Sequence, residues 1–181
     1  MDRQPTLETE RLLLRPLESG DWNGLFAIAS NAHVWEQHPM HDRWRADVFR
    51  EFFDDALAKG GALAVIDKAK ERIIGSSRFQ AFEEEDGGSV EIGWTFLDPF
   101  YWGKGHNHEM KRAMLSHAFK TVSRVDFRVG ETNYRSREAL ENIGAVRTRQ
   151  TELMRFDHKR VLHIVYEITR ENFAAGPLGG G

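Results

Sequence analysis

Two glycines past the middle of the chain stand in a pattern that suits phosphate binding. Gly103 and Gly105 lie in the run 101–107 (YWGKGHN), between a strand-like segment and an amphipathic, helix-like one. Glycines let several backbone N–H groups turn toward one point, and a helix N-terminus adds roughly half a positive charge there. The run therefore predicts a binding site for a phosphorylated cofactor, and a pyrophosphate is the group that suits this pattern.

Several other kinds of site are excluded by residue type or spacing. The glycines match neither GxxxxGK[ST] nor GxGxxG, because position 108 is histidine. The chain has no cysteine, which excludes disulfides, thiolate catalysis and cysteine zinc sites. His33, His38 and His41 fit no strong zinc spacing and lack a clear fourth ligand, so no metal is expected.

Composition limits the partners and the number of domains. A chain of 181 residues with no internal linker predicts one domain over 1–173, followed by a flexible glycine-rich tail over 174–181. A formal net charge of -3 argues against nucleic acid or an anionic membrane as the main partner. No signal-like or membrane-spanning apolar run is present, so a cytoplasmic location is the expectation.

The elements that must position the glycine run can be outlined from periodicity and turn residues. Strands are expected at 12–17, 63–67, 72–82, 90–97 and 125–129, and helices at 21–31, 47–59, 106–122 and 133–143. The acidic run 83–86 suits a solvated hairpin tip, and 148–156 with 160–169 suits a closing hairpin. So many hairpins predict a mixed α/β (α+β) domain with a mostly antiparallel sheet.

Two of these elements carry a predicted side-chain orientation. In 90–97 the even-numbered residues are expected on one face of the strand and the odd-numbered residues on the other. In 47–59, helical spacing predicts an inward face of Val48, Phe52, Ala56 and Leu57. Both patterns make specific claims that a structure can test.

At this point the chain resembles the GNAT-fold N-acetyltransferases, in the RimJ/RimL-like branch of ribosomal-protein N-terminal acetyltransferases. The resemblance runs from Leu7 to Phe173 and is carried by 9–15 (TERLLLR), 91–94 (EIGW), 101–105 (YWGKG), 133–136 (NYRS) and 143–145 (IGA). It implies a GNAT fold, with a mixed, mostly antiparallel central sheet, about four flanking helices and a C-terminal β-hairpin.

The resemblance also implies an activity. It is N-acetyl transfer from acetyl-CoA directly to a primary amine, on a peptide N-terminus or a small molecule, through a ternary complex. The expected partners are that amine acceptor and acetyl-CoA as co-substrate, with no metal, nucleic acid or membrane; a homodimer is left open. A catalytically degenerate GNAT-like module that binds acetyl-CoA or a partner is the alternative.

The family's acetyl-CoA motif, Arg/Gln-x-x-Gly-x-Gly/Ala, falls on Trp102, Gly105 and Asn107, and Asn107 is a bulkier residue than the motif prefers. Leu97 is expected to pair its backbone with the pantetheine arm, and Asn133 to contact that arm from the far side. The main-chain groups expected to hold the pyrophosphate are those of Trp102, Gly103, Lys104, Gly105, His106 and Asn107.

Proton handling is the open question of the predicted chemistry. Only about one lysine-like amine in 2500 is unprotonated at pH 7, so a base is useful, and Glu91 is the candidate; a structural carboxylate is the alternative. The place of the family's proton-donating tyrosine is Leu140, which leaves Ser136 as the candidate hydroxyl or as a plain first-turn helix residue.

The acceptor pocket is expected, from the resemblance, in the loop 33–41. Trp35 can wall a groove or stack on a cation, Glu36 can attract an amine, and His38 lies beside them. Ordinary packing is the alternative for the tryptophan. The identity of the amine is not encoded in any motif of the chain.

Overall fold

The computed structural model of the protein describes residues 1–156 and 159–179. In these residues an eight-stranded sheet is combined with five α-helices. The strands are β1 (Leu7–Glu8), β2 (Leu12–Pro16), β3 (Ala62–Asp67), β4 (Arg72–Glu83), β5 (Ser89–Leu97), β6 (Arg124–Gly130), β7 (Val146–Phe156) and β8 (Lys159–Thr169). The helices are α1 (Trp22–Ala29), α2 (Ala46–Lys59), α3 (His106–Ala118), α4 (Tyr134–Asn142) and α5 (Arg170–Ala175).

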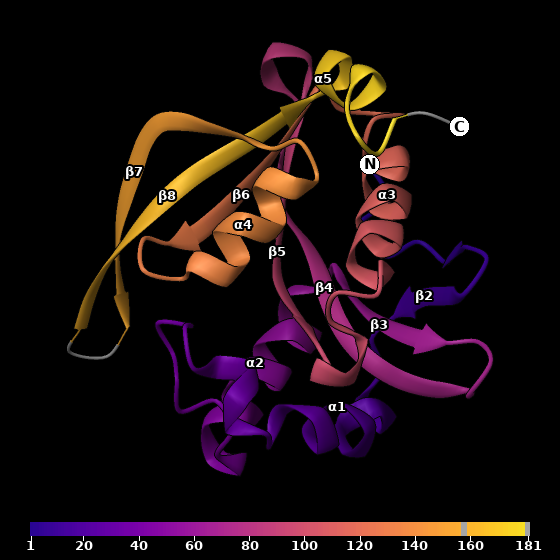
Figure 1. Cartoon of the computed structure of the whole chain (residues 1–181), viewed down its shortest axis with the longest axis vertical. Coiled ribbons are helices and arrows are strands. Elements are labelled where there is room, and N and C mark those ends of the chain that lie inside the picture. The colour runs from indigo at the N-terminus through magenta and orange to yellow at the C-terminus, as the bar shows by residue number, and fades with distance from the viewer. Residues whose placement is uncertain (157–158, 180–181) are drawn as a thin grey trace.

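The sheet runs in the order β1-β2-β3-β4-β5-β6-β8-β7 (Figure 1). Its neighbours are antiparallel except β5 and β6, which are parallel. Buried side chains form two clusters: the larger joins the sheet to α3 and α4, and the smaller joins it to α1 and α2. These helix pairs therefore cover opposite faces, which confirms the predicted mixed, mostly antiparallel fold.

The parallel pair β5 and β6 separates soon after it begins. The two strands pair only at Ser89, Val90 and Glu91. Beyond Glu91, β5 still pairs with β4 as far as Leu97, while β6 pairs with β8 as far as Gly130. Each strand thus keeps one free edge, and the sheet is open along a wedge between them.

A β-bulge accompanies this opening and corrects the prediction of regular alternation in 90–97. Trp94 has φ of +52°, and the β4–β5 register shifts between Ser76 and Arg78. An extra residue in a strand bends it and reverses the faces beyond it. As a result Ile92 and Leu97 share the larger core, whereas Phe96 lies in the smaller one.

The inward face of α2 also differs from its prediction. Phe49, Phe53 and Ala56 are buried, whereas Phe52 is only partly buried. The ring of Trp22 on α1 packs against both Phe49 and Phe53, at centroid distances of 5.5 and 5.4 Å. The helix carries apolar residues on two adjacent stripes, and contact with α1 selects between them. Val48 and Leu57 are likewise only partly buried.

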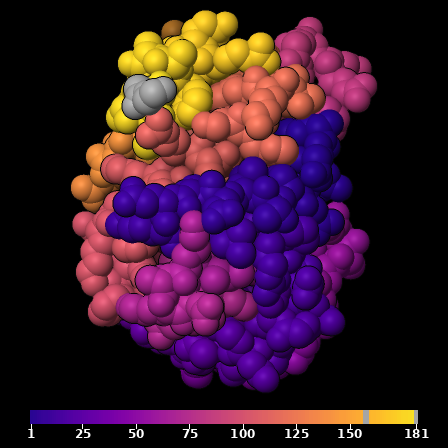
Figure 2. All heavy atoms as spheres, turned by 90° about the vertical axis from the view of Figure 1, so that its right-hand side faces the viewer, coloured from indigo at the N-terminus to yellow at the C-terminus, as the bar shows by residue number. Residues whose placement is uncertain are grey.

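The described residues after 173 pack on the domain, within the segment 174–181 for which a flexible glycine-rich tail is predicted. Helix α5 continues to Ala175, and Leu178 is 7% exposed and belongs to the larger core. In Figure 2 the C-terminal segment, in yellow, lies above α3, and the indigo N-terminal segment crosses below it. The end of the predicted tail, 180–181, and the predicted turn at 157–158 lie outside the described residues.

None of the helices in the described part of the chain combines the length and apolarity needed to cross a bilayer.

Candidate active site

The glycine run forms a tight bend at the start of α3. Gly103 has φ of +68° and Gly105, the N-cap of α3, has φ of +80°. This left-handed region is open to glycine at little cost, and a β-branched residue would be strained there. The first amides of an α-helix have no acceptor within the helix. The bend therefore presents backbone donors and the positive end of α3 at one place.

An ion pair fastens this bend to the N-terminal strand. Arg11 donates from Nε to Glu109 Oε2 at 2.6 Å and from Nη1 to the Lys104 carbonyl at 3.1 Å. Glu109 Oε1 accepts from the Arg11 amide and the Thr9 hydroxyl. Two residues of the run 9–15 thus hold the first turn of α3, and the Glu109 charge near the helix N-terminus is neutralised.

A cavity of about 570 Å³ begins at this bend and passes through the opening between β5 and β6. Its wall includes residues from both cores, so it reaches from the α3–α4 face of the sheet to the α1–α2 face. Of the predicted site residues, the structure places these on the wall: Trp35, His38, Leu97, Trp102, Gly103, Gly105, Asn107, Asn133 and Ser136.

On the cofactor side, two predicted residues already make local hydrogen bonds. The Leu97 carbonyl accepts from the Trp102 indole N–H at 3.0 Å. Asn133 caps α4, its Oδ1 accepting from the Ser136 amide at 3.3 Å, which confirms the predicted helix start. The Ser136 side chain is partly buried on the cavity wall.

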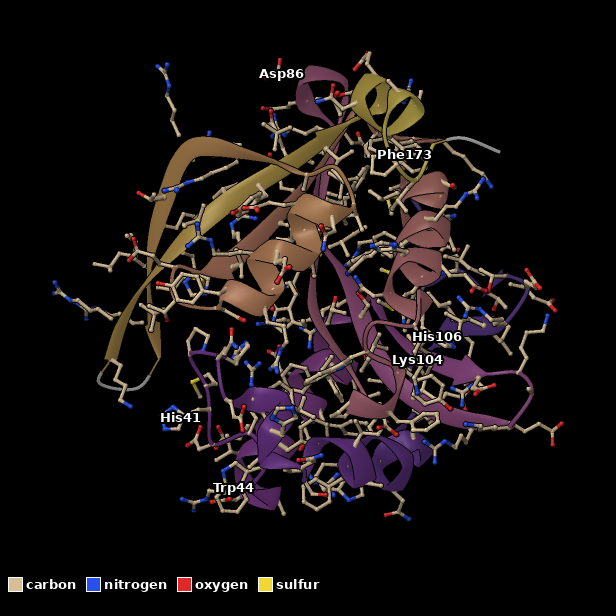
Figure 3. The ribbon with its side chains drawn as sticks, viewed as in Figure 1. His41, Trp44, Asp86, Lys104, His106 and Phe173 are labelled. Carbon is tan, nitrogen blue, oxygen red and sulfur yellow. The ribbon has the colours of Figure 1, made fainter. Side chains whose placement is uncertain are left out.

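Lys104 and His106 lie outside the wall, although they flank the bend (Figure 3). The Lys104 ammonium is 3.5 Å from the centre of the Phe100 ring, and the His106 ring packs edge-on to Tyr101 at 4.8 Å. Because both side chains pack against aromatic rings, we expect these two residues to contact a phosphate through their main-chain groups.

Glu91 lies beside the cavity and is absent from the residues that line it. Its Oε2 accepts from Arg128 Nη1 at 2.7 Å, and Arg128 Nε donates to Glu152 at 2.9 Å. Burial raises the pKa of the Glu91 carboxyl, while the Arg128 charge opposes that rise. The carboxylate is thus paired with Arg128, a residue of the cavity wall, and its role as a base stays a prediction.

The predicted acceptor loop divides into buried and exposed residues. Trp35 is buried, donates from Nε1 to the Ala29 carbonyl at 2.8 Å, and also lines the cavity. His38 lines it too, and burial together with Arg43 lowers the His38 pKa well below its usual value. Glu36 points to solvent, paired with His33 at 2.8 Å, and does not line the wall.

Sequence reasoning missed Lys111, which lies on the cavity wall. Its side chain is 4% exposed, lines the cavity, and donates from Nζ to Thr95 Oγ1 at 2.7 Å and to Ser77 Oγ at 3.2 Å. Burial alone lowers the pKa of Lys111 to about 7. One feature of the sequence could have indicated Lys111: it stands at a position of the helix 106–118 that faces the sheet together with the apolar residues.

Comparison with known proteins fits this geometry. A family model described as an acetyltransferase (GNAT) domain matches residues 11–146, which is more than half of the chain. The chain belongs to the GNAT family of acetyltransferases. A curated relative, the uncharacterized N-acetyltransferase YnaD of Bacillus subtilis (strain 168), is 31% identical over 125 residues, covering 65% of this chain and 67% of YnaD.

Two solved acetyltransferase structures show the same fold. One is ribosomal-protein-S5-alanine acetyltransferase from Vibrio fischeri (TM-score 0.68, 17% identity, 94% of this chain and 99% of that one). The other is spermidine N-acetyltransferase from Vibrio cholerae in complex with CoA and spermine (TM-score 0.66, 20% identity, 91% of this chain and 99% of that one). The matches to the family model and to YnaD make the protein a GNAT N-acetyltransferase, and this family uses acetyl-CoA.

The bend in this GNAT domain fits the diphosphate of acetyl-CoA by its own geometry. An added Cβ at Gly103 would meet no atom within 4 Å, so the space above it is open. At Gly105 the nearest atom to an added Cβ is Arg11 Nη2, at 3.4 Å, which places a guanidinium beside the bend. Asn107 lines the cavity in the first turn of α3.

Proposed function

We propose that the protein moves the acetyl group of acetyl-CoA directly to a primary amine, on a small molecule or a peptide N-terminus, in a ternary complex. The observation that carries the proposal is the cavity through the sheet. Its cofactor end lies at the glycine bend on the α3–α4 side, and its other end lies among Trp35, His38 and Phe96 on the α1–α2 side. Two substrates can therefore meet from opposite faces.

Bound acetyl-CoA supplies an acetyl group activated as a thioester. In the transfer, the amine nitrogen forms a bond to the acetyl carbon, the carbon–sulfur bond breaks, the nitrogen loses a proton and the sulfur gains one. The chain contributes mainly by alignment and by donors for the developing oxyanion. The free edge of β5 between Gly93 and Leu97 offers backbone groups at the wedge.

Lys111 fits the role of proton donor to the departing sulfur. The position at which many GNAT enzymes carry a tyrosine is Leu140, which has no proton to give. Lys111, on α3, lines the same cavity as Leu140, and its ammonium donates to two hydroxyls. A group with a pKa of about 7 exchanges its proton readily at neutral pH. Ser136 stays the second candidate.

The RimJ/RimL-like branch is supported by the runs 9–15 and 101–105, and the fold is shared with the Vibrio fischeri alanine acetyltransferase. A peptide N-terminus is one acceptor that this branch would favour. Its α-amine has a pKa near 8, so about one molecule in ten is already reactive at pH 7.

The test combines binding with turnover. Calorimetry should show acetyl-CoA binding, and a thiol-specific dye should report CoA release when an amine from a broad panel is added. Absence of acetyl-CoA binding would overturn the proposal. Binding without CoA release for every amine would instead favour a GNAT module that has lost catalysis.

A further inference from the structure

The acceptor end of the cavity is unusual for a site that receives a cationic amine. The wall of the whole cavity includes Arg43, Arg128 and Arg135 besides Lys111, and none of the described residues lining it is Asp or Glu. Arg128 is neutralised by Glu91 and Glu152. Arg135 is turned to the cofactor side, its guanidinium lying 4.1 Å from the centre of the Trp102 ring. These contacts account for Arg128 and Arg135, and Arg43 is the arginine of the wall for which they name no partner.

Arg43 is a buried cation whose contacts are mostly with rings. It is 9% exposed, and its guanidinium carbon lies 4.6 Å from the centre of the Phe52 ring and 5.5 Å from that of Trp35. Among the described residues, no carboxylate forms an ion pair with it. Burial and the nearby Arg78 lower its pKa to about 10, against weaker effects of Asp42 and Asp55.

Hydrogen-bond counting at His38 gives a second, independent observation. His38 Nδ1 accepts from the Met40 amide at 2.9 Å. A neutral imidazole with that acceptor carries its proton on Nε2. Nε2 lies 3.2 Å from Arg43 Nη1, so two donors face each other. The alternative tautomer only moves the conflict to Met40, and in either case one N–H lacks an acceptor.

Arg78 adds a third cationic group behind this wall. It is 1% exposed, and its Nη1 donates to Asp55 and Gln80. Its Nε and Nη2 are buried with no partner in the described structure, and its guanidinium carbon lies 4.9 Å from the ring centre of Trp94, which lines the cavity. Buried cationic donors without acceptors are costly, and an anion placed among them removes that cost.

We propose that Trp35, His38, Arg43 and Trp94 form an anion subsite that binds a carboxylate of the acceptor, so that the preferred acceptors are amino-carboxylates such as free amino acids. This inference rests on the proposed acetyl transfer. The carboxylate accepts from Arg43 and His38, and the amine of the same molecule reaches the wedge between β5 and β6. Polyamines, which bring only positive charge, are disfavoured at this wall.

The activity arm of the test uses matched acceptors with acetyl-CoA. L-α-amino acids, their carboxamides and the corresponding amines without the carboxyl group are compared by kcat/KM for CoA release, together with spermidine and a series from glycine to 6-aminohexanoate. The free acids should exceed their amides by about 10- to 100-fold, the range for a hydrogen bond to a charged group. The series locates the amine relative to the subsite.

The variant arm isolates Arg43. Arg43→Gln should remove the preference for acids mainly through KM, and Arg43→Lys should keep part of it. Arg45→Gln is the matched control, because Arg45 is exposed, pairs with Asp47 at 2.8 Å and does not line the cavity. An unfolding midpoint for each variant separates loss of the subsite from loss of the fold.

A binding arm keeps this inference separable from the proposed activity. N-acetylated amino acids should bind by calorimetry to the wild type in the presence of CoA, while their amides should not, and Arg43→Gln should lose the difference. Equal kcat/KM for acids, amides and plain amines, or equal binding of the acetylated acid and amide, overturns the subsite and leaves acetyl transfer standing. Turnover of no amine overturns the proposed function, and the binding comparison still decides the subsite.

Discussion

Replacing Lys111 by methionine should stabilise the protein, because the lysine is buried and its hydrogen-bond partners in the described structure are two neutral hydroxyls. Its pKa falls from 10.5 to about 7 on folding. That difference corresponds to about 5 kcal/mol of lost stability wherever both states are protonated. Methionine has a similar length, and Ser77 and Thr95 can still bond to each other across 2.8 Å. After loss of two hydrogen bonds of about 1 kcal/mol each, a gain of about 3 kcal/mol remains.

The sign of the pH dependence follows from the same shift. Below pH 7 the folded and unfolded chains both carry the proton, and the penalty is complete. Between pH 7 and 10.5 the unfolded chain is protonated while the folded chain is not, so the wild-type free energy of unfolding rises with pH, by up to about 1.4 kcal/mol per unit. Lys111→Met should remove this rise and gain most of its stability near pH 6.

Urea unfolding of both proteins between pH 6 and 9.5 measures these differences, with Lys120→Met, an exposed lysine, as the control. The reasoning is refuted if Lys111→Met is less stable than the wild type at pH 6 and has the same slope with pH. The variant should also lose turnover while retaining acetyl-CoA binding. A stable variant with unchanged kcat would remove Lys111 from the proton transfer.

Three further variants test other parts of the argument. Gly105→Val should weaken acetyl-CoA binding at least tenfold in calorimetry through about 1–3 kcal/mol of strain at φ of +80°, whereas Gly20→Ala, in open space, should not change it. Glu91→Gln should remove the fall of kcat at low pH if the Glu91 carboxylate is the base. An unchanged pH profile would mean that Glu91 serves only to pair with Arg128. Leu178→Ala should lower the free energy of unfolding by about 2–3 kcal/mol, and no change would support the prediction of a free tail.

The residues that sequence reasoning placed well are those whose signals are local. The bend at Gly103 and Gly105 follows from backbone angles that other residues rarely adopt. The start of α4 follows from the Asn133 cap, and the hairpins follow from short turns between alternating strands. The GNAT fold was predictable for the same reason, since its motifs lie in short runs whose order along the chain is visible.

The residues that were misplaced depend on what faces them across the fold. The bulge at Trp94 reverses the faces of β5, and no local pattern in 90–97 announces it. The partner of Glu91 also depends on the fold, because β6 brings Arg128 against it; its role as a base stays a prediction beside the alternative of a structural carboxylate. Leu178 lies in the segment predicted as a flexible tail, but its side chain is buried in the larger hydrophobic cluster, which distant segments of the chain form.

By itself the sequence determined the glycine bend, the order of the elements and the chemistry of the cofactor, because backbone angles, caps and periodicity act over a few residues. Only the tertiary structure decided where the free edges of β5 and β6 open the sheet, and which charges meet there. Lys111 and Arg43 are ordinary surface-type residues in the sequence. Their chemistry comes from burial, and burial is set by segments far away in the chain.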